Sequence, residues 1–115
     1  MIFVIDDDYV MAECVAKATK TECRIFMNAI EAMNEIADGV MPEMIFLDIL
    51  LDGPDGFTFL NELVSYEDTR KIPVVIVSSL DYKDLDLSQY SVVGYLNKDS
   101  MRPEEVSRYV ENYTK

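Results

Sequence analysis

Four places in this 115-residue sequence hold side chains that could together bind a metal ion and handle a phosphoryl group. Asp6 and Asp7 follow a short apolar run near the N-terminus, Asp48 follows a second run, and Ser78 and Lys98 follow two more. Carboxylate oxygens are ligands that Mg²⁺ prefers, and a carboxylate can also act as a nucleophile. A serine hydroxyl and a lysine ammonium can stabilise the oxygens of a transferred group.

The apolar runs before these residues predict the strands of a sheet. Three of the runs are apolar at every position, which is typical of central strands buried on both faces. They are Ile2–Ile5, Met44–Leu47 and Val74–Val77. Two weaker runs, Cys23–Met27 and Val92–Leu96, are better suited to flanking strands.

Helical patterns separate the runs. The predicted helices are Tyr9–Thr19, Ala29–Ala37, Phe57–Tyr66, Tyr82–Tyr90 and Pro103–Tyr113. The fourth of these alternates polar and apolar residues, so we expect it to be short or irregular. In the first, Val10, Cys14 and Val15 form the stripe expected to face the core. Strict alternation of strand and helix predicts one doubly wound α/β domain over residues 1–115, with a five-stranded parallel sheet and helices on both faces.

In such a sheet, ligands bind beyond the carboxyl ends of the strands. The sequence therefore predicts that Asp6, Asp7 and Asp48 meet at one edge. Two carboxylates about 5 Å apart repel by roughly 3 kcal/mol at an effective dielectric near 20, and a divalent cation would relieve that repulsion. Helix capping is the structural alternative for the N-terminal aspartates, although it accounts for one of them rather than for three.

Composition excludes several kinds of function. A formal net charge of −12 disfavours direct contact with nucleic acid or with an anionic membrane surface. The absence of histidine excludes a Ser-His-Asp triad and a histidine zinc site. Cys14 and Cys23 are expected to be reduced, buried thiols. The apolar runs are too short to span a membrane and the first residues lack a basic n-region, so a cytoplasmic location is expected.

The strand-end motifs resemble those of the receiver domain of two-component response regulators, over essentially the whole chain. The matching segments are Ile5-Asp6-Asp7-Asp8, Phe46-Leu47-Asp48-Ile49, Asp55-Gly56-Phe57, Ile72-Pro73-Val74-Val75-Ile76-Val77-Ser78-Ser79 and Gly94-Tyr95-Leu96-Asn97-Lys98. The resemblance implies a flavodoxin-like strand order of 2-1-3-4-5. It also implies phosphorylation by a histidine kinase or a histidine phosphotransfer protein and an effect on a downstream target, with a homodimer left open.

The resemblance also implies a metal site and the residue that is phosphorylated. Asp48 corresponds to the phosphoacceptor. Asp7 corresponds to a direct Mg²⁺ ligand and Asp6 to a ligand acting mainly through water. The backbone carbonyl of Leu50 matches the family's third protein ligand.

Three further residues match positions that respond to phosphorylation in the family. Lys98 corresponds to the lysine that holds the phosphoryl group, Ser78 to the switch hydroxyl and Tyr95 to the switch aromatic residue. Self-phosphorylation from a phosphodonor and slow autodephosphorylation are the only enzymatic activities expected, with no separate substrate.

The sequence departs from the family pattern near the site. Asp99 follows Lys98 where the family usually has proline after a cis peptide bond. Because a non-proline cis bond costs about 3 kcal/mol, we expect a trans bond here and a lysine placed differently. Asp52 lies in an acidic, glycine-containing loop and is expected to face water. Leu50 and Leu80 flank the expected phosphoryl position and would orient water poorly, which predicts slow loss of the phosphoryl group.

Two alternatives remain open at this point. Asp6 and Asp8, with the later Ser78 and Lys98, also fit the motifs of a haloacid-dehalogenase-type phosphatase, in which Asp6 would be the nucleophile. A receiver-like interaction module that is never phosphorylated is the second alternative. The identity of the phosphorylated aspartate separates the first from a receiver, and Mg²⁺ binding separates the second.

Overall fold

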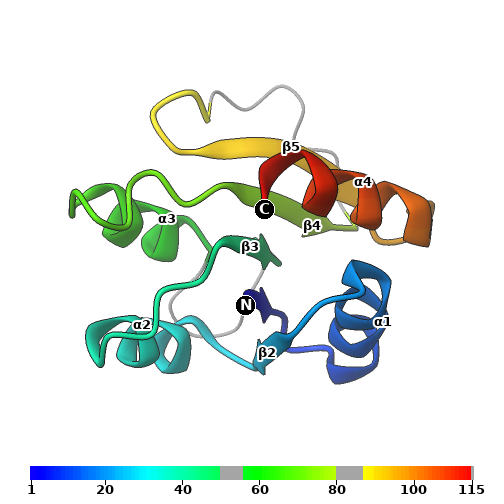
Figure 1. The fold of residues 1–115 in the computed structure, drawn as a ribbon, viewed down its shortest axis with the longest axis horizontal. Helices are drawn as coiled ribbons and strands as arrows, with labels where there is room; N and C mark the ends of the chain where they lie inside the picture. The colour runs from blue at the N-terminus through cyan, green and yellow to red at the C-terminus, as the bar shows by residue number, and fades with distance from the viewer. Residues whose placement is uncertain (50–55, 80–86, 115) are drawn as a thin grey trace.

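Five parallel strands form a single sheet in the computed structural model, which describes residues 1–49, 56–79 and 87–114 (Figure 1). The strands are β1 (Ile2–Ile5), β2 (Cys23–Phe26), β3 (Met44–Leu47), β4 (Val74–Ser78) and β5 (Val92–Asn97). Their spatial order is β2-β1-β3-β4-β5, with every neighbouring pair parallel. The predicted fold class and strand order are confirmed.

Four helices of the described residues cover the two faces of this sheet. They are α1 (Tyr9–Thr19), α2 (Ala29–Ala37), α3 (Gly56–Val64) and α4 (Pro103–Tyr113). Helices α2 and α3 lie side by side on one face, and α1 and α4 pack against each other on the opposite face (Figure 1). Polar side chains begin two of the helices: Asp8 accepts from Met11 N–H at the start of α1, and Asn28 accepts from Glu31 N–H at the start of α2.

Alternate residues of the central strands enter two separate hydrophobic layers. Phe3 and Ile5 of β1 pack in the layer beneath α2 and α3, whereas Ile2 and Val4 pack in the layer beneath α1 and α4. All four residues of β1 are buried. This is the burial that their uninterrupted apolar sequence predicts, because side chains alternate across a strand and both faces are covered.

The predicted buried face of α1 is confirmed at Val15 and wrong at Val10 and Cys14. The residues that this helix buries are Ala12, Val15, Ala18 and Thr19. Val10 is 72% exposed, and Cys14 is exposed as well. Val15 packs with Ala12 and Ala18 in the layer beneath α4, whereas Val10 and Cys14 lie outside that layer. The expectation of a buried Cys14 is therefore corrected, and Cys23 is half-buried.

Most predicted elements agree with the observed ones to within two residues. The predicted helix over Tyr82–Tyr90 falls largely outside the described residues, and its described end forms a turn in which Tyr90 N–H donates to the Leu87 carbonyl. The last predicted helix is α4, where Arg102 N–H donates to the Glu105 carboxylate. None of the helices in the described part of the chain is long and apolar enough to cross a membrane.

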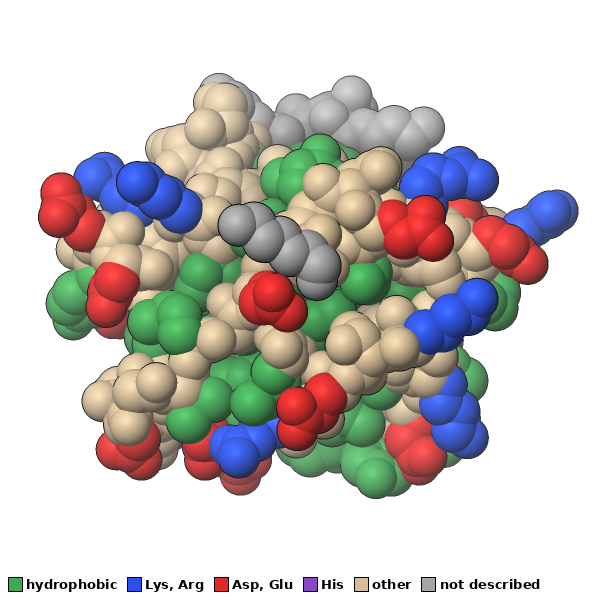
Figure 2. Space-filling model, in the orientation of Figure 1, with side chains coloured by type: hydrophobic (Ala, Val, Ile, Leu, Met, Phe, Trp, Pro, Cys, Tyr) green, Lys and Arg blue, Asp and Glu red, His purple; other side chains and the backbone are tan. Residues whose placement is uncertain are grey.

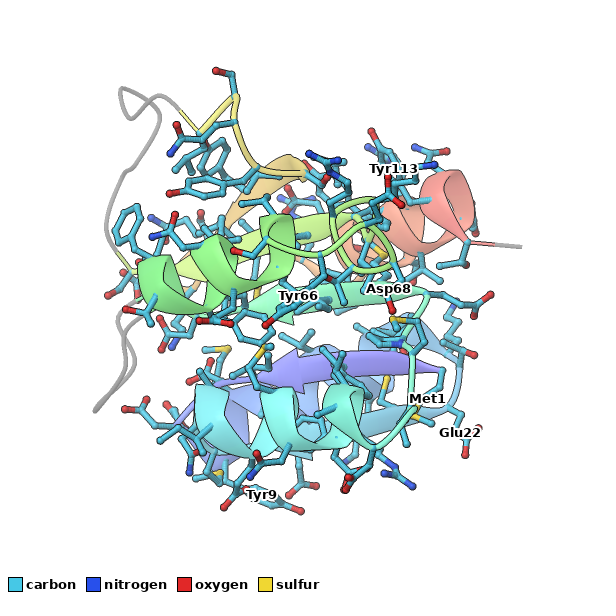
Figure 3. All side chains as sticks on the ribbon, turned by 90° about the vertical axis from the view of Figure 1, so that its left-hand side faces the viewer. Met1, Tyr9, Glu22, Tyr66, Asp68 and Tyr113 are labelled. Carbon is cyan, nitrogen blue, oxygen red and sulfur yellow. The ribbon has the colours of Figure 1, made fainter. Side chains whose placement is uncertain are left out.

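Charged and apolar side chains share the surface. Figure 2 shows acidic groups at several separate places on the face in view, with hydrophobic side chains between them. On the face with α2 and α3, Tyr66 lies between the two helices (Figure 3) and remains 55% exposed.

Candidate phosphoryl-transfer and metal site

Two aspartates are held at the carboxyl edge of the sheet by backbone hydrogen bonds. Asp6 N–H donates to the Phe26 carbonyl at 3.0 Å, and Asp48 N–H donates to the Ile5 carbonyl at 2.9 Å. These bonds continue the β1–β2 and β1–β3 pairing by one residue. Both side chains are nearly buried, Asp6 being 2% and Asp48 4% exposed. The pairing of the strands therefore places two carboxylates side by side, as predicted.

Lys98 joins these aspartates from the end of β5. Its ammonium nitrogen lies 3.0 Å from Asp6 Oδ2 and 3.0 Å from Asp48 Oδ2. Only 15% of the Lys98 side chain is exposed. The positive charge is thus shared between two nearly buried carboxylates, and both ion pairs are close enough for hydrogen bonds.

Asp7 completes an acidic cluster suited to a hard divalent cation. One carboxylate oxygen from each of Asp6, Asp7 and Asp48 lies within 4.8 Å of the other two. Asp7 is exposed, so the cluster is open to solvent on one side. An all-oxygen set with room for water is the environment that Mg²⁺ favours. The residues present therefore fit a magnesium site.

The pKa values of Asp6 and Lys98 are both raised, which disfavours the charged form of Asp6 and favours the charged form of Lys98. Burial raises the pKa of Asp6, opposed by hydrogen bonds from Asp8 N–H and Lys98. Burial lowers the pKa of Lys98, but hydrogen bonds and attraction from Asp6 and Asp48 outweigh it and raise that pKa overall. Lys98 consequently stays protonated at neutral pH, whereas an ionised Asp6 is held at a cost.

The remaining predicted site residues lie on the same strands or outside the described residues. Ser78 is buried at the end of β4, directly paired with Asn97 of β5. Tyr95 lies on β5 and is 37% exposed. Leu50, predicted as a carbonyl ligand, lies outside the described residues, as do Asp52 and Leu80.

Gly56 shapes the segment that follows Asp48. A β-carbon at Gly56 would lie 2.6 Å from the Cα of Ile49, and Gly56 N–H donates to the Ile49 carbonyl. The backbone at Gly56 therefore packs directly against the backbone at Ile49, next to Asp48, and leaves no space for a side chain at position 56. The Asp55-Gly56 motif was identified from the sequence, but this reason for the glycine was not.

The peptide bond after Lys98 agrees with expectation. The described residues contain no cis peptide bond, so Lys98 and Asp99 are joined in trans. The ammonium reaches both Asp6 and Asp48 from this trans backbone. Asn97 lies in one of the matching segments, but the sequence analysis did not predict that its side-chain oxygen accepts from Asp99 N–H. An asparagine two residues before that N–H was the available signal.

The fold and site define a class of signalling domain: a doubly wound sheet with an acidic cluster and a facing lysine at its carboxyl edge. The family model described as response regulator receiver domain matches residues 2–111. The chain belongs to this receiver-domain family.

Individual relatives support the same assignment. Over 41 residues, or 36% of the chain, it is 44% identical to response regulator PleD from Caulobacter vibrioides, of which it covers 9%. The receiver domain of NtrX from Brucella abortus superimposes with a TM-score of 0.84 at 25% identity, over 98% of this chain and 97% of that one. The phosphorylated cyanobacterial phytochrome response regulator RcpA gives a TM-score of 0.72 at 25% identity, over 96% of this chain and 88% of that one.

Proposed function

We propose that this receiver domain accepts a phosphoryl group on Asp48 from a histidine kinase or a histidine phosphotransfer protein. The observation that carries the proposal is the position of the Lys98 ammonium, 3.0 Å from Asp48 and 3.0 Å from Asp6. A carboxylate that accepts a phosphoryl group must tolerate additional negative charge nearby, and a fixed cation stabilises that charge. Lys98 is such a cation, and the raised pKa keeps it charged.

The reaction in this proposal is one displacement followed by one hydrolysis. An Asp48 carboxylate oxygen attacks phosphorus, the new P–O bond forms, and the P–N bond to the donor imidazole breaks, with the imidazole as leaving group. Water later attacks the phosphorus of the acyl phosphate and regenerates the Asp48 carboxylate together with inorganic phosphate. Lys98 keeps its proton throughout and acts as a charge that faces the phosphoryl oxygens.

Asp6, Asp7 and Asp48 are the described residues that would hold Mg²⁺, with the Leu50 carbonyl as the additional ligand implied by the family. When bound, Mg²⁺ supplies positive charge that offsets repulsion between the carboxylates and the incoming phosphoryl oxygens. The convergence of three carboxylates supports this assignment, because they repel one another and a divalent cation would add to the positive charge that Lys98 already supplies to Asp6 and Asp48.

Signal output in this proposal involves Ser78 and Tyr95. The Ser78 hydroxyl would hydrogen-bond a phosphoryl oxygen, and Tyr95 would change its exposure on β5 in response. The support is positional: Ser78 ends the strand next to β3, and Tyr95 lies three residues before Lys98. A downstream target protein or a second copy of the domain would read this change, in the cytoplasm.

Incubation with a small acyl-phosphate donor tests the proposal, with intact mass as the readout. We expect one phosphoryl group with Mg²⁺ present and none when a chelator removes it. Mg²⁺ should also raise the melting temperature, because a ligand that binds only the folded state stabilises that state. At a concentration about one hundred times Kd, the free energy of unfolding rises by about 2.7 kcal/mol. Absence of both the phosphoryl group and the thermal shift would instead favour a phosphorylation-independent interaction module.

A further inference from the structure

The turn after β5 fixes the backbone of Lys98 on both sides. Lys98 N–H donates to the Ser78 carbonyl at 2.9 Å, which continues the β4–β5 pairing one residue beyond Asn97. The next N–H along the chain, that of Asp99, donates to the side-chain oxygen of Asn97 at 2.8 Å. The two peptide groups that flank the Lys98 Cα are therefore both hydrogen-bonded.

Asn97 supplies most of the acceptors in this turn. Its backbone carbonyl accepts from Ser100 N–H at 3.2 Å and from Met101 N–H at 2.8 Å, in addition to the bond that its side chain accepts from Asp99. A side-chain oxygen that accepts from the N–H two residues ahead forms an Asx turn, which asparagine favours. Because Asn97 is exposed, its conformation follows from these hydrogen bonds rather than from burial in the core.

This turn matters because the charge of Lys98 lies far from its backbone. A lysine side chain has several rotatable bonds, and ordering it costs up to about 2 kcal/mol of conformational free energy. A small rotation of the backbone at Lys98 would displace the distant ammonium from its position 3.0 Å from Asp48. A turn that restricts the backbone reduces the number of conformations from which the ammonium must be ordered.

We propose that Asn97 is a positioning residue for phosphoryl transfer: its side-chain oxygen, through the Asx turn with Asp99 N–H, directs the Lys98 ammonium toward Asp48. The inference rests on the proposed function of Asp48. It adds a residue that does not touch the reacting atoms and acts through Lys98. It also explains how Lys98 reaches the acidic cluster although Asp99, and not the proline usual in the family, follows it.

Two variants of Asn97 test the inference, in the presence and absence of Lys98. Asn97→Ala removes the acceptor, and Asn97→Asp retains an acceptor oxygen at the same distance along the side chain. With the acyl-phosphate donor and Mg²⁺, we expect Asn97→Ala to slow phosphorylation about tenfold, the effect of losing roughly 1.4 kcal/mol. Asn97→Asp should restore most of the rate. When Lys98→Ala is already present, adding Asn97→Ala should cause no further slowing.

A second readout does not depend on phosphorylation. Acylation of the Lys98 amine by an amine-reactive reagent, followed by peptide mass analysis, reports how well the ion pairs protect it. We expect faster labelling of Lys98 in Asn97→Ala than in the wild type, and labelling near the wild-type rate in Asn97→Asp. Lys71, which is exposed, gives an internal reference whose labelling should be the same in all three proteins.

Three results would overturn the inference: unchanged Lys98 labelling in Asn97→Ala, equal slowing by Asn97→Ala with and without Lys98, or failure of Asn97→Asp to restore both readouts. The second result would mean that Asn97 supports the fold without acting through Lys98. A wild-type protein that takes no phosphoryl group would overturn the proposed function and the rate effect with it. The labelling would then still decide whether Asn97 positions Lys98.

Discussion

The Lys98 ammonium lies 3.0 Å from Asp48 Oδ2, although 50 positions separate the two residues in the chain. The same nitrogen is equally close to Asp6. The contact depends on the parallel sheet, because β1, β3 and β5 bring their carboxyl ends to the same edge. One cation thereby faces two nearly buried anions that would otherwise repel each other.

Removal of this cation should destabilise the protein, and more strongly without divalent metal. In Lys98→Ala, two nearly buried carboxylates lose a partner, and we expect a loss of about 3 kcal/mol in the free energy of unfolding. Mg²⁺ should recover a larger part of that loss than it adds to the wild type, because it supplies charge to the same carboxylates. Urea unfolding with chelator and with Mg²⁺ measures both effects.

The matched control is Lys71→Ala, since Lys71 is exposed. Its stability should lie within about 0.5 kcal/mol of the wild type in both conditions. Equal stability of Lys98→Ala and Lys71→Ala would contradict the ion pairs as described.

Asp6→Asn should have opposite effects on the apo and the metal-bound protein. Burial raises the pKa of Asp6, so the folded state at neutral pH carries a cost for its ionisation. That cost is present above the folded-state pKa and disappears as the pH falls through it toward the unfolded value. The neutral amide avoids the cost and can still accept from Asp8 N–H, so we expect a higher melting temperature in chelator.

The same substitution removes one charge from the acidic cluster, and so the Mg²⁺-induced rise in melting temperature should become smaller. Differential scanning fluorimetry across a Mg²⁺ titration checks both signs. A lower melting temperature in chelator, or an undiminished response to Mg²⁺, would count against this description of Asp6.

Gly94 and Tyr109 should show strong coupling in stability. A β-carbon at Gly94 would lie 2.0 Å from the Tyr109 hydroxyl oxygen, so Gly94→Ala forces the ring away from β5. We expect a loss of about 2 kcal/mol, which is typical of overpacking. In the double variant with Tyr109→Ala, the clash is absent and the total loss should be smaller than the sum of the single losses. Additive losses in a double-mutant cycle would refute the contact.

Thiol labelling distinguishes the two cysteines. Cys14 is exposed on α1, whereas Cys23 is half-buried, its sulfur lies 3.1 Å from the Thr19 hydroxyl, and burial raises its pKa. Because the thiolate is the reactive form, we expect alkylation at neutral pH to modify Cys14 first. Cys14→Ser should remove the fast phase and Cys23→Ser should leave it. Equal rates at both positions would be inconsistent with the exposed face of α1.

The central strands and the acidic cluster were predictable because each depends on a strong local signal. Runs such as Ile2–Ile5 are apolar at every position, and the carboxyl-edge rule then brings Asp6 and Asp48 together without any knowledge of contacts. The matching motifs added the expected roles of Lys98 and Ser78.

Features that depend on tertiary distance were not predictable in the same way. The hydrophobic stripe of α1 was predicted correctly at Val15 but not at Val10 and Cys14, because periodicity alone does not show that Ala12 packs in the layer beneath α4. The close approach of Gly56 to Ile49 likewise could not be predicted, because the glycine does not indicate which residue it packs against.

The most direct test of the central claim identifies which aspartate is phosphorylated. The wild type, Asp48→Asn and Asp8→Asn are incubated with Mg²⁺ and the acyl-phosphate donor and weighed intact. Asp8→Asn is the matched control, since Asp8 lies beside the cluster and asparagine can also cap α1. We predict one phosphoryl group on the wild type and on Asp8→Asn, and none on Asp48→Asn. A phosphoryl group retained by Asp48→Asn, and located on Asp6, would contradict the assignment of Asp48 as the acceptor.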